Sequence, residues 1–178
     1  MVDHDMPPEI VLEIVQLLNN QGIEVILDGG WAVDALLGRQ SRPHEDLDVA
    51  VFHEDVPVIR ALLEGLGYFI VPRDDSWECN FVYGNEDGHL IDIHSCSFDE
   101  EKKNSYGVEY TWAALQGRGE IGGVQVRCIP PHILVEYHSG YPLDANDFHD
   151  VRLLCEKFNL DMPPDFQPFL DDEQGVSP

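Results

Sequence analysis

Residues 28–51 read DGGWAVDALLGRQSRPHEDLDVAV, and this stretch constrains the fold and chemistry of the 178-residue chain more than any other. Gly29 and Gly30 open a short apolar helix, a loop containing arginines follows, and Asp46 and Asp48 stand two residues apart on a strand. Because strand side chains alternate between the two faces, both carboxylates project to the same side. This order of elements predicts a site that binds the phosphates of a nucleotide beside a divalent metal ion.

The size and apolar content of the chain allow a substantial core, since 43% of its residues are hydrophobic. We expect an α/β domain over residues 1–129 and a C-terminal helical region with its tail over residues 130–178. The tail is expected to dock on the domain but to be irregular and to fray, because it is rich in proline and acidic residues.

Apolar spacing and turn residues give the expected order of elements. Helices are predicted for residues 8–21, 31–37, 56–66, 133–139 and 147–158. Strands are predicted for residues 23–27, 47–52, 68–71, 77–83, 89–94 and 124–129. The strands at 77–83 and 89–94 form a hairpin, and the glycines at 117, 119, 122 and 123 are interpreted as turns before the last strand.

The net charge of the chain limits the classes of partner that it can bind. The chain has 34 acidic and 10 basic residues, a formal charge of -24, which repels nucleic acids and anionic membrane surfaces. A cationic small molecule or protein suits this surface, and so does a simple role in solubility. There is no basic leader followed by an apolar run and no stretch of about 18 apolar residues, so we expect a cytoplasmic protein. The four cysteines form no CxxC pair and are expected to be reduced core thiols.

The carboxylates are the candidates for chemistry. Asp46 and Asp48 would repel each other unless a cation lay between them, and hard oxygen ligands suit Mg²⁺; a solvated strand face is the alternative. Asp92 interrupts the apolar strand LIDIH and would complete the metal site or accept a proton; it could instead pair with an arginine. His94 is on the same strand face and either orients Asp92 or is a hydrogen-bonded core residue.

A second group of residues suits phosphate binding. Gly29 and Gly30 let the backbone approach a ligand and expose the start of a helix to an anion, although a tight turn without a ligand has the same pattern. Arg39 and Arg42 are in the connecting loop, and a guanidinium matches phosphate oxygens. His44 belongs with these nucleotide-binding candidates, where it shapes the loop rather than reacts.

The stretch GGWAVDALLGRQSRPHEDLDVAV, followed by the strand LIDIH, resembles the signature of the antibiotic nucleotidyltransferases, the lincosamide and aminoglycoside adenylyltransferases of the polymerase-β-like superfamily. Residues 140–158 also resemble the C-terminal helix of that family. The resemblance implies an α+β fold, with a mixed twisted sheet flanked by helices and a small C-terminal helical lobe. It also implies that Asp46 and Asp48 hold Mg²⁺ and that Asp92 matches the proposed general base.

One position departs from the family pattern. The family often has a lysine just before the aspartates of its last helix, where this chain reads ANDFHD from residue 145. The resemblance then implies that contact with the phosphates is weakened or passes to Arg152 or Lys157.

The reaction predicted for such a site is transfer of a nucleoside monophosphate, AMP if the donor is ATP, to a hydroxyl of a small molecule, with release of pyrophosphate. An aminoglycoside or a lincosamide is the expected acceptor, and both choices stay open. Candidate acceptor-binding residues combine aromatic and acidic side chains: Trp77, Glu78, Tyr83, Glu86 and Tyr106.

A function of another class is also compatible with this pattern. The same fold serves as a nucleotidyltransferase-like antitoxin or regulatory module, and the acidity of the chain would suit masking a basic protein partner. Neither a nucleic acid nor a membrane is expected as a partner, and the chain is expected to be a monomer or a homodimer.

Overall fold

A computed structural model describes residues 5–173 and shows one mixed, eight-stranded sheet with helices on both sides. The strands are β1 (Val25–Leu27), β2 (Asp46–Phe52), β3 (Phe69–Val71), β4 (Asn80–Gly84), β5 (Leu90–Phe98), β6 (Asn104–Gly107), β7 (Gly117–Ile121) and β8 (Val124–Cys128). Their order across the sheet is β3-β4-β5-β2-β1-β8-β7, and β6 pairs with β5. The pairs β2/β5 and β1/β8 are parallel and the others antiparallel, so the expected mixed α+β fold is confirmed.

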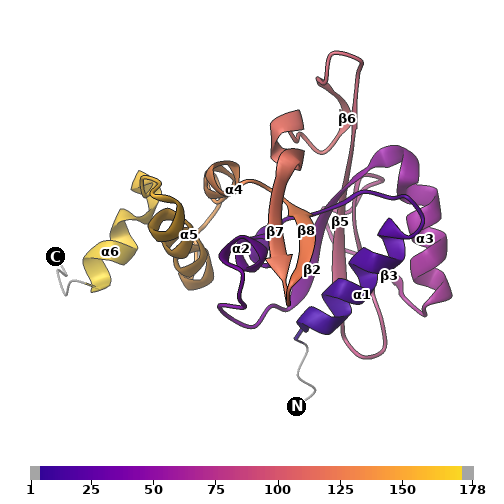
Figure 1. Cartoon of the computed structure of the whole chain (residues 1–178), viewed down its shortest axis with the longest axis horizontal. Helices are drawn as coiled ribbons and strands as arrows, with labels where there is room; N and C mark the ends of the chain where they lie inside the picture. Colours follow the sequence, from indigo (N-terminus) through magenta and orange to yellow (C-terminus); the bar gives the residue numbers. More distant parts are fainter. Residues whose placement is uncertain (1–4, 174–178) are drawn as a thin grey trace.

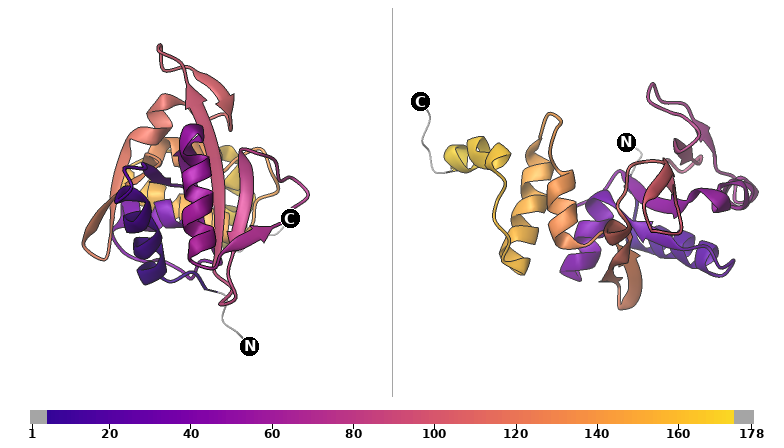
Figure 2. Two further views of the ribbon diagram at one scale, coloured as in Figure 1. Left: turned by 90° about the vertical axis from the view of Figure 1, so that its right-hand side faces the viewer. Right: turned by 90° about the horizontal axis from the view of Figure 1, so that it is seen from above.

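The helices divide between the two sides of this sheet (Figure 1). They are α1 (Pro8–Asn19), α2 (Gly29–Leu37), α3 (Val56–Gly65), α4 (Pro131–Tyr137), α5 (Ala145–Phe158) and α6 (Gln167–Glu173). Helices α1 and α3 lie on one side and α2 on the other, and α4, α5 and α6 continue outward beyond α2 (Figures 1 and 2).

Local sequence explains where several of these elements begin and end. The first turns of α1 and α3 each contain a proline. Proline lacks a backbone N–H, and this is tolerated because the N–H groups of a first turn have no partner within the helix. Gly38 ends α2 in the left-handed conformation, as its position after the apolar run predicts. The carboxylate of Asp144 caps α5 in a reciprocal capping box with Asp147.

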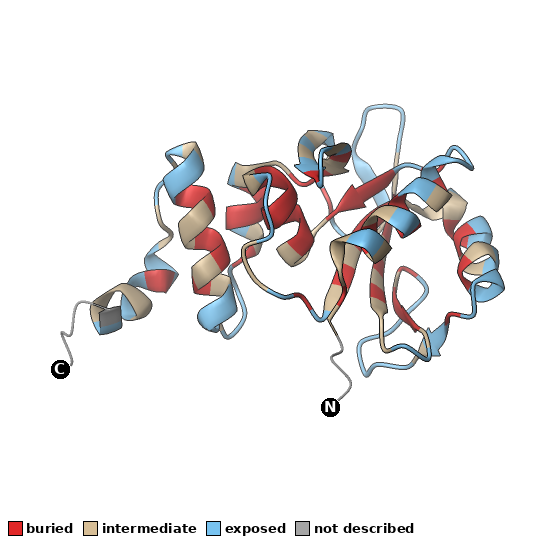
Figure 3. Ribbon diagram, turned by 60° about the horizontal axis from the view of Figure 1, so that its bottom comes forward, coloured by how far each residue is buried: buried red, intermediate tan, exposed pale blue. Residues whose placement is uncertain are grey.

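The core follows the sheet and the inner faces of the helices (Figure 3). Its largest fully buried side chains include Ile26, Leu27, Leu47 and Ile91 from three adjacent strands. All four cysteines are buried and free, which confirms the prediction of reduced core thiols. Within residues 5–173 no helix combines the length and apolar character that a membrane span requires.

The structure corrects the sequence-based elements at three places. Gly117 and Gly119 are not turn residues but belong to β7, which forms a hairpin with β8. Strand β6, for which the apolar spacing predicts no element, follows the charged segment at residues 99–103 and pairs with β5. The tail expected to be irregular forms α6, because Phe166 and Phe169 stack with Phe148 of α5 and give the segment an apolar anchor. Residues 174–178, also part of that prediction, are outside the described range.

Candidate active site

Four aspartates gather where β1, β2 and β5 lie side by side. In the parallel pair β2/β5, Asp48 stands directly opposite Asp92, and Asp46 is one alternation away on the same face. Asp28 follows β1, and its backbone N–H donates to the carbonyl of Asp48 at 2.9 Å. The register of three neighbouring strands therefore brings together the three aspartates identified from the sequence and a fourth, Asp28, that sequence reasoning missed.

The carboxylates in this cluster are short of positive charge. Burial, together with Asp92 and Glu45, raises the pKa of Asp46. Burial raises the pKa of Asp48 well above its usual value, and the neighbouring Asp46 and Asp28 raise it further. Ionising all four groups is costly unless a cation is present, as expected for a site that binds a divalent ion.

One carboxylate oxygen of Asp92 has no hydrogen-bond partner within residues 5–173. Its Oδ1 is buried and accepts no hydrogen bond of good geometry, although Nε2 of His94 lies 3.3 Å away as an ion-pair partner. Burial lowers the pKa of His94, but the nearby carboxylate of Asp92, together with those of Asp48 and Asp28, raises it overall. His94 and Asp92 therefore act as a pair on one strand face, as their spacing predicts.

The donor chemistry of the cluster fits Mg²⁺. Residues 5–173 contain no three His, Cys, Asp or Glu side chains arranged to hold a metal ion by themselves. Mg²⁺ is usually bound by one or two carboxylates, with water and substrate phosphates completing its six positions. Asp46 and Asp48 supply hard ligands of that kind, and Asp92, expected from the sequence to complete the metal site or to accept a proton, lies directly beside them.

Gly29 and Gly30 allow close packing beside the cluster. Asp28 caps α2 by accepting the Gly29 N–H at 2.8 Å, and Gly29 has a φ of 54°. A Cβ on Gly29 would overlap the Asp48 carboxylate, and one on Gly30 would overlap the His44 imidazole. The start of α2 thus lies against the carboxylates, and its role in holding phosphate stays a prediction.

Arg42 and His44 already have partners within the protein. Arg42 makes a bidentate pair with Asp150 of α5, with Nε to Oδ1 at 3.0 Å and Nη2 to Oδ2 at 2.6 Å. His44 is 2% exposed, and its Nε2 lies 2.5 Å from Oδ2 of Asp34. Both residues join the loop before β2 to helices, so any phosphate contact by Arg42 would have to share its guanidinium with Asp150.

Two other basic candidates lie at the far end of α2. Arg39 is exposed and follows Gly38, which ends the helix. Nζ of Lys157 donates to the carbonyls of Leu36 and Leu37 at 3.0 and 2.9 Å. The structure does not bring Arg39 or Lys157 to the Gly29 end of the helix.

Arg152, the other residue to which the phosphate contact was expected to pass, pairs with Glu156 one turn along α5.

The acceptor-binding candidates do not form one group. Trp77 and Tyr106 are exposed, and their ring centroids are 6.4 Å apart in an edge-to-face arrangement. The Tyr106 hydroxyl donates to Glu78. Tyr83 is buried, and its hydroxyl donates to Glu64 of α3 at 2.8 Å, on the sheet face opposite Asp92. Glu86 is in the exposed turn between β4 and β5.

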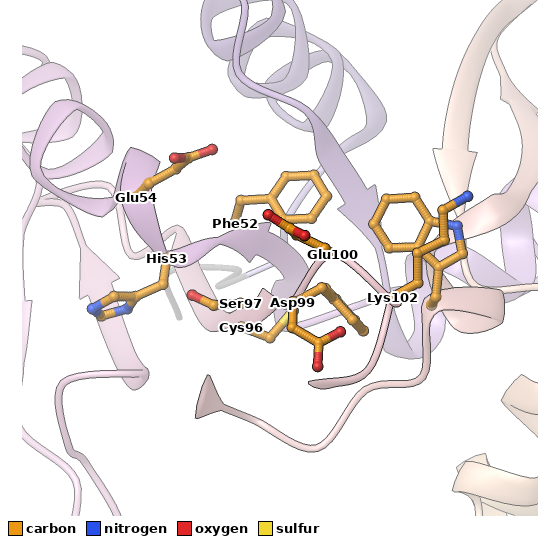
Figure 4. A pocket seen from close by; sticks show the side chains of 10 residues that line it. Phe52, His53, Glu54, Cys96, Ser97, Asp99, Glu100 and Lys102 are labelled. Carbon is orange, nitrogen blue, oxygen red and sulfur yellow. The ribbon is translucent and has the colours of Figure 1, made fainter. Parts of the chain in front are cut away.

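A cavity of about 390 Å³ lies at the other end of β2 and β5 (Figure 4). Phe52, Phe98 and Trp112 form its aromatic wall, and the Nζ of Lys102 lies 4.8 Å from the Trp112 ring. None of the four clustered aspartates lines this cavity.

Sequence reasoning missed two residues beside the cluster. Asp28 had a detectable signal, because it directly follows a buried strand and precedes the glycine pair. Tyr110 had none, since it is in an irregular segment after β6, yet its hydroxyl donates to Oδ2 of Asp28 at 2.6 Å.

Comparison with known proteins places this site in context. Residues 10–154 match the family model described as aminoglycoside-2''-adenylyltransferase. A lincosamide resistance protein from Staphylococcus haemolyticus is 25% identical over 163 residues, covering 86% of this chain and 98% of the relative. A 2''-aminoglycoside nucleotidyltransferase from Escherichia coli is 33% identical over 120 residues, covering 67% of this chain and 65% of the relative.

Solved structures share the fold. The lincosamide antibiotic adenylyltransferase LnuA, with lincomycin bound, aligns with a TM-score of 0.74 at 22% identity, covering 84% of this chain and 97% of that one. ANT(2'')-Ia in complex with adenylyl-2''-tobramycin aligns with a TM-score of 0.68 at 23% identity, covering 85% and 88%. The family match over residues 10–154 spans the sheet, α4 and most of α5.

Proposed function

Since the chain belongs to the aminoglycoside-2''-adenylyltransferase family and is a nucleotidyltransferase, we propose that it adenylylates a hydroxyl of an aminoglycoside or lincosamide antibiotic. The donor in this proposal is ATP, the reaction depends on Mg²⁺, and pyrophosphate is released. One relative named for each antibiotic class supports the two acceptors.

The observation that carries the proposal is the register of β2 and β5. It sets Asp48 opposite Asp92 and keeps Asp46 on the same face, beside the start of α2. Such an arrangement suits a reaction in which charge develops on phosphate oxygens next to a hydroxyl that must lose a proton.

Each residue has a separate part in the proposed mechanism. Mg²⁺, when bound, would neutralise phosphate charge and lower the barrier to attack on the α-phosphorus. Asp46 and Asp48 hold it through their carboxylates, and Asp92 accepts the proton of the attacking hydroxyl. The backbone at Gly29 and Gly30 accommodates phosphate at the positive end of the α2 dipole.

The region over residues 130–178 is proposed to act as a separate helical domain that contributes to the acceptor side. Helix α5 reaches the loop before β2 through the Arg42–Asp150 pair, so this region is tied to the site. The acidic character of the chain favours acceptors with several amines, while the exposed Trp77 and Tyr106 would suit an acceptor with an apolar sugar face.

The proposal is tested by incubating the protein with Mg²⁺, labelled ATP and separate aminoglycosides and lincosamides. Pyrophosphate release together with an adenylyl mass shift on an antibiotic is the expected result. No product with any acceptor in either class would contradict the proposal, and binding to a basic protein without turnover would favour a regulatory module.

The metal-ligand assignment is tested with Asp46→Asn and Asp48→Asn. Each variant removes one ligand charge with little change in volume, so activity should fall by about two to four orders of magnitude while the fold is retained. Asp161→Asn, which makes the same change at an exposed position after α5, is the matched control and should keep full activity. Normal turnover in both site variants would refute the assignment.

A further inference from the structure

A series of polar contacts links Asp92 to Asp28 through His94 and Tyr110, and the proposed mechanism assigns no role to His94 or Tyr110. Oδ1 of Asp92 lies 3.3 Å from Nε2 of His94, and Nδ1 of His94 lies 3.1 Å from the Tyr110 hydroxyl. That hydroxyl donates to Oδ2 of Asp28 at 2.6 Å. The four groups therefore connect the candidate base on β5 to the residue that caps α2.

The direction of these contacts follows from the proton inventory of each group. A carboxylate can only accept, so the single Tyr110 proton points to Asp28. The Tyr110 oxygen then offers a lone pair to His94, and Nδ1 of His94 must carry a hydrogen for the contact to be attractive. Burial and the nearby Asp28 raise the pKa of Tyr110 well above its usual value, so the hydroxyl keeps this proton.

The position of Tyr110 is well determined. Its side chain is 5% exposed, and its ring lies 6.0 Å from that of Tyr137 on α4. The Asn104 side-chain amide donates to the carbonyls of Val108 and Tyr110, which holds the segment after β6 in place. Because the hydroxyl contacts both Asp28 and His94, it can impose one orientation on the His94 ring.

We propose that Tyr110 is a positioning residue for the active site: anchored on Asp28, its hydroxyl holds Nδ1 of His94 and fixes the imidazole ring with Nε2 beside Asp92. The fixed ring lies against Oδ1 of Asp92, and this contact holds the carboxylate in one orientation. The oriented Asp92 then presents its other oxygen to the acceptor hydroxyl. This role rests on the proposed function, in which Asp92 is the base.

The test combines spectroscopy with kinetics on Tyr110→Phe, which removes one oxygen and preserves the buried ring. In protein labelled with ¹⁵N-histidine, the His94 signals are assigned by their loss in His94→Gln. We expect the ring ¹⁵N signals of His94 to shift in Tyr110→Phe, because Nδ1 loses its hydrogen-bond partner. The kcat should fall about 10- to 100-fold, with the KM for ATP changed by less than about twofold.

A second buried tyrosine supplies the matched control. Tyr68 is 6% exposed and lies just before β3, and Tyr68→Phe should leave the His94 signals and kcat unchanged. A Tyr110→Phe variant with native His94 signals, or with native kcat, would overturn the proposal. If the His94 signals shift in Tyr110→Phe but the native protein modifies no acceptor, the proposed function fails and the catalytic role of Tyr110 fails with it, while its hydrogen-bond role is retained.

Discussion

The absent side chain at Gly30 leaves space that two other residues use. A Cβ there would overlap Nδ1 of His44 and lie 2.8 Å from Nη2 of Arg42. Both of those side chains are held in place, one by Asp34 and the other by Asp150. They cannot withdraw without losing short, charge-assisted hydrogen bonds.

Gly30→Ala should therefore destabilise the protein by about 1–3 kcal/mol, the usual cost of overpacking. The melting temperature should fall by roughly 2–4 °C for each kcal/mol in a chain of this size. Gly65→Ala is the control, because Gly65 is helical and no atom lies within 4 Å of the added methyl group. That variant should be neutral or slightly stabilised, and an equal loss in both would show that crowding by His44 is not the cause.

At the residue scale, the sequence predicts the position of a side chain where strand alternation determines which face it is on. Spacing alone predicts that Asp46 and Asp48 share one strand face, and the register of β2 and β5 adds Asp92 to that face. Arg42 and Asp150 are 108 positions apart, and no local pattern indicates that they pair. Partners of this kind depend on how α5 packs on α2, which is a property of the tertiary structure.

At the scale of elements, α2 is held differently at its two ends. Its first turn is capped by Asp28 next to the aspartate cluster, and its last carbonyls accept hydrogen bonds from Lys157 of α5. A cation at the C-terminal end of a helix is favourable because the dipole is negative there. Lys157 therefore fastens the C-terminal region to the helix that begins at the site.

Lys157→Met should destabilise the protein by about 1 kcal/mol, and by less at high salt, because it keeps most of the apolar stem and removes the charge. Lys103→Met is the matched control, since the Lys103 side chain is 71% exposed and pairs with Glu101, which is 72% exposed. Its expected effect is below about 0.5 kcal/mol. Urea denaturation at low and high NaCl would measure both, and identical losses would contradict a capping role for Lys157.

The elements found from sequence were those with a strong apolar period. Helices α1 and α3 and strands β1, β2 and β5 follow that signal. Strand β7 does not follow the apolar period, because three of its five residues are Gly117, Arg118 and Gly119. Gly119 packs against the backbone of Ala35 in α2, where no side chain would fit, so tertiary packing placed a glycine-rich segment in the sheet.

At the scale of the whole molecule, the net charge of -24 affects stability as well as partners. Like charges repel in the compact state, so added salt should stabilise the protein by screening. The aspartate cluster adds a local contribution, since burial and neighbouring carboxylates raise the pKa of Asp48 and ionising it at neutral pH costs folding free energy. A general screening effect and a specific metal effect can therefore be separated by comparing salts.

Mg²⁺ should raise the melting temperature of the native protein more than NaCl at equal ionic strength. At a concentration 100 times the Kd, a bound ligand adds about 2.7 kcal/mol. Asp48→Asn should lose this extra rise and keep the response to NaCl, because the variant removes one ligand but only one of the 34 acidic residues that give the chain its charge. Without metal, the same variant should melt at a higher temperature than the native protein, since one repelling carboxylate is gone. Equal responses of the two proteins to Mg²⁺ would show that the aspartate cluster does not hold the ion.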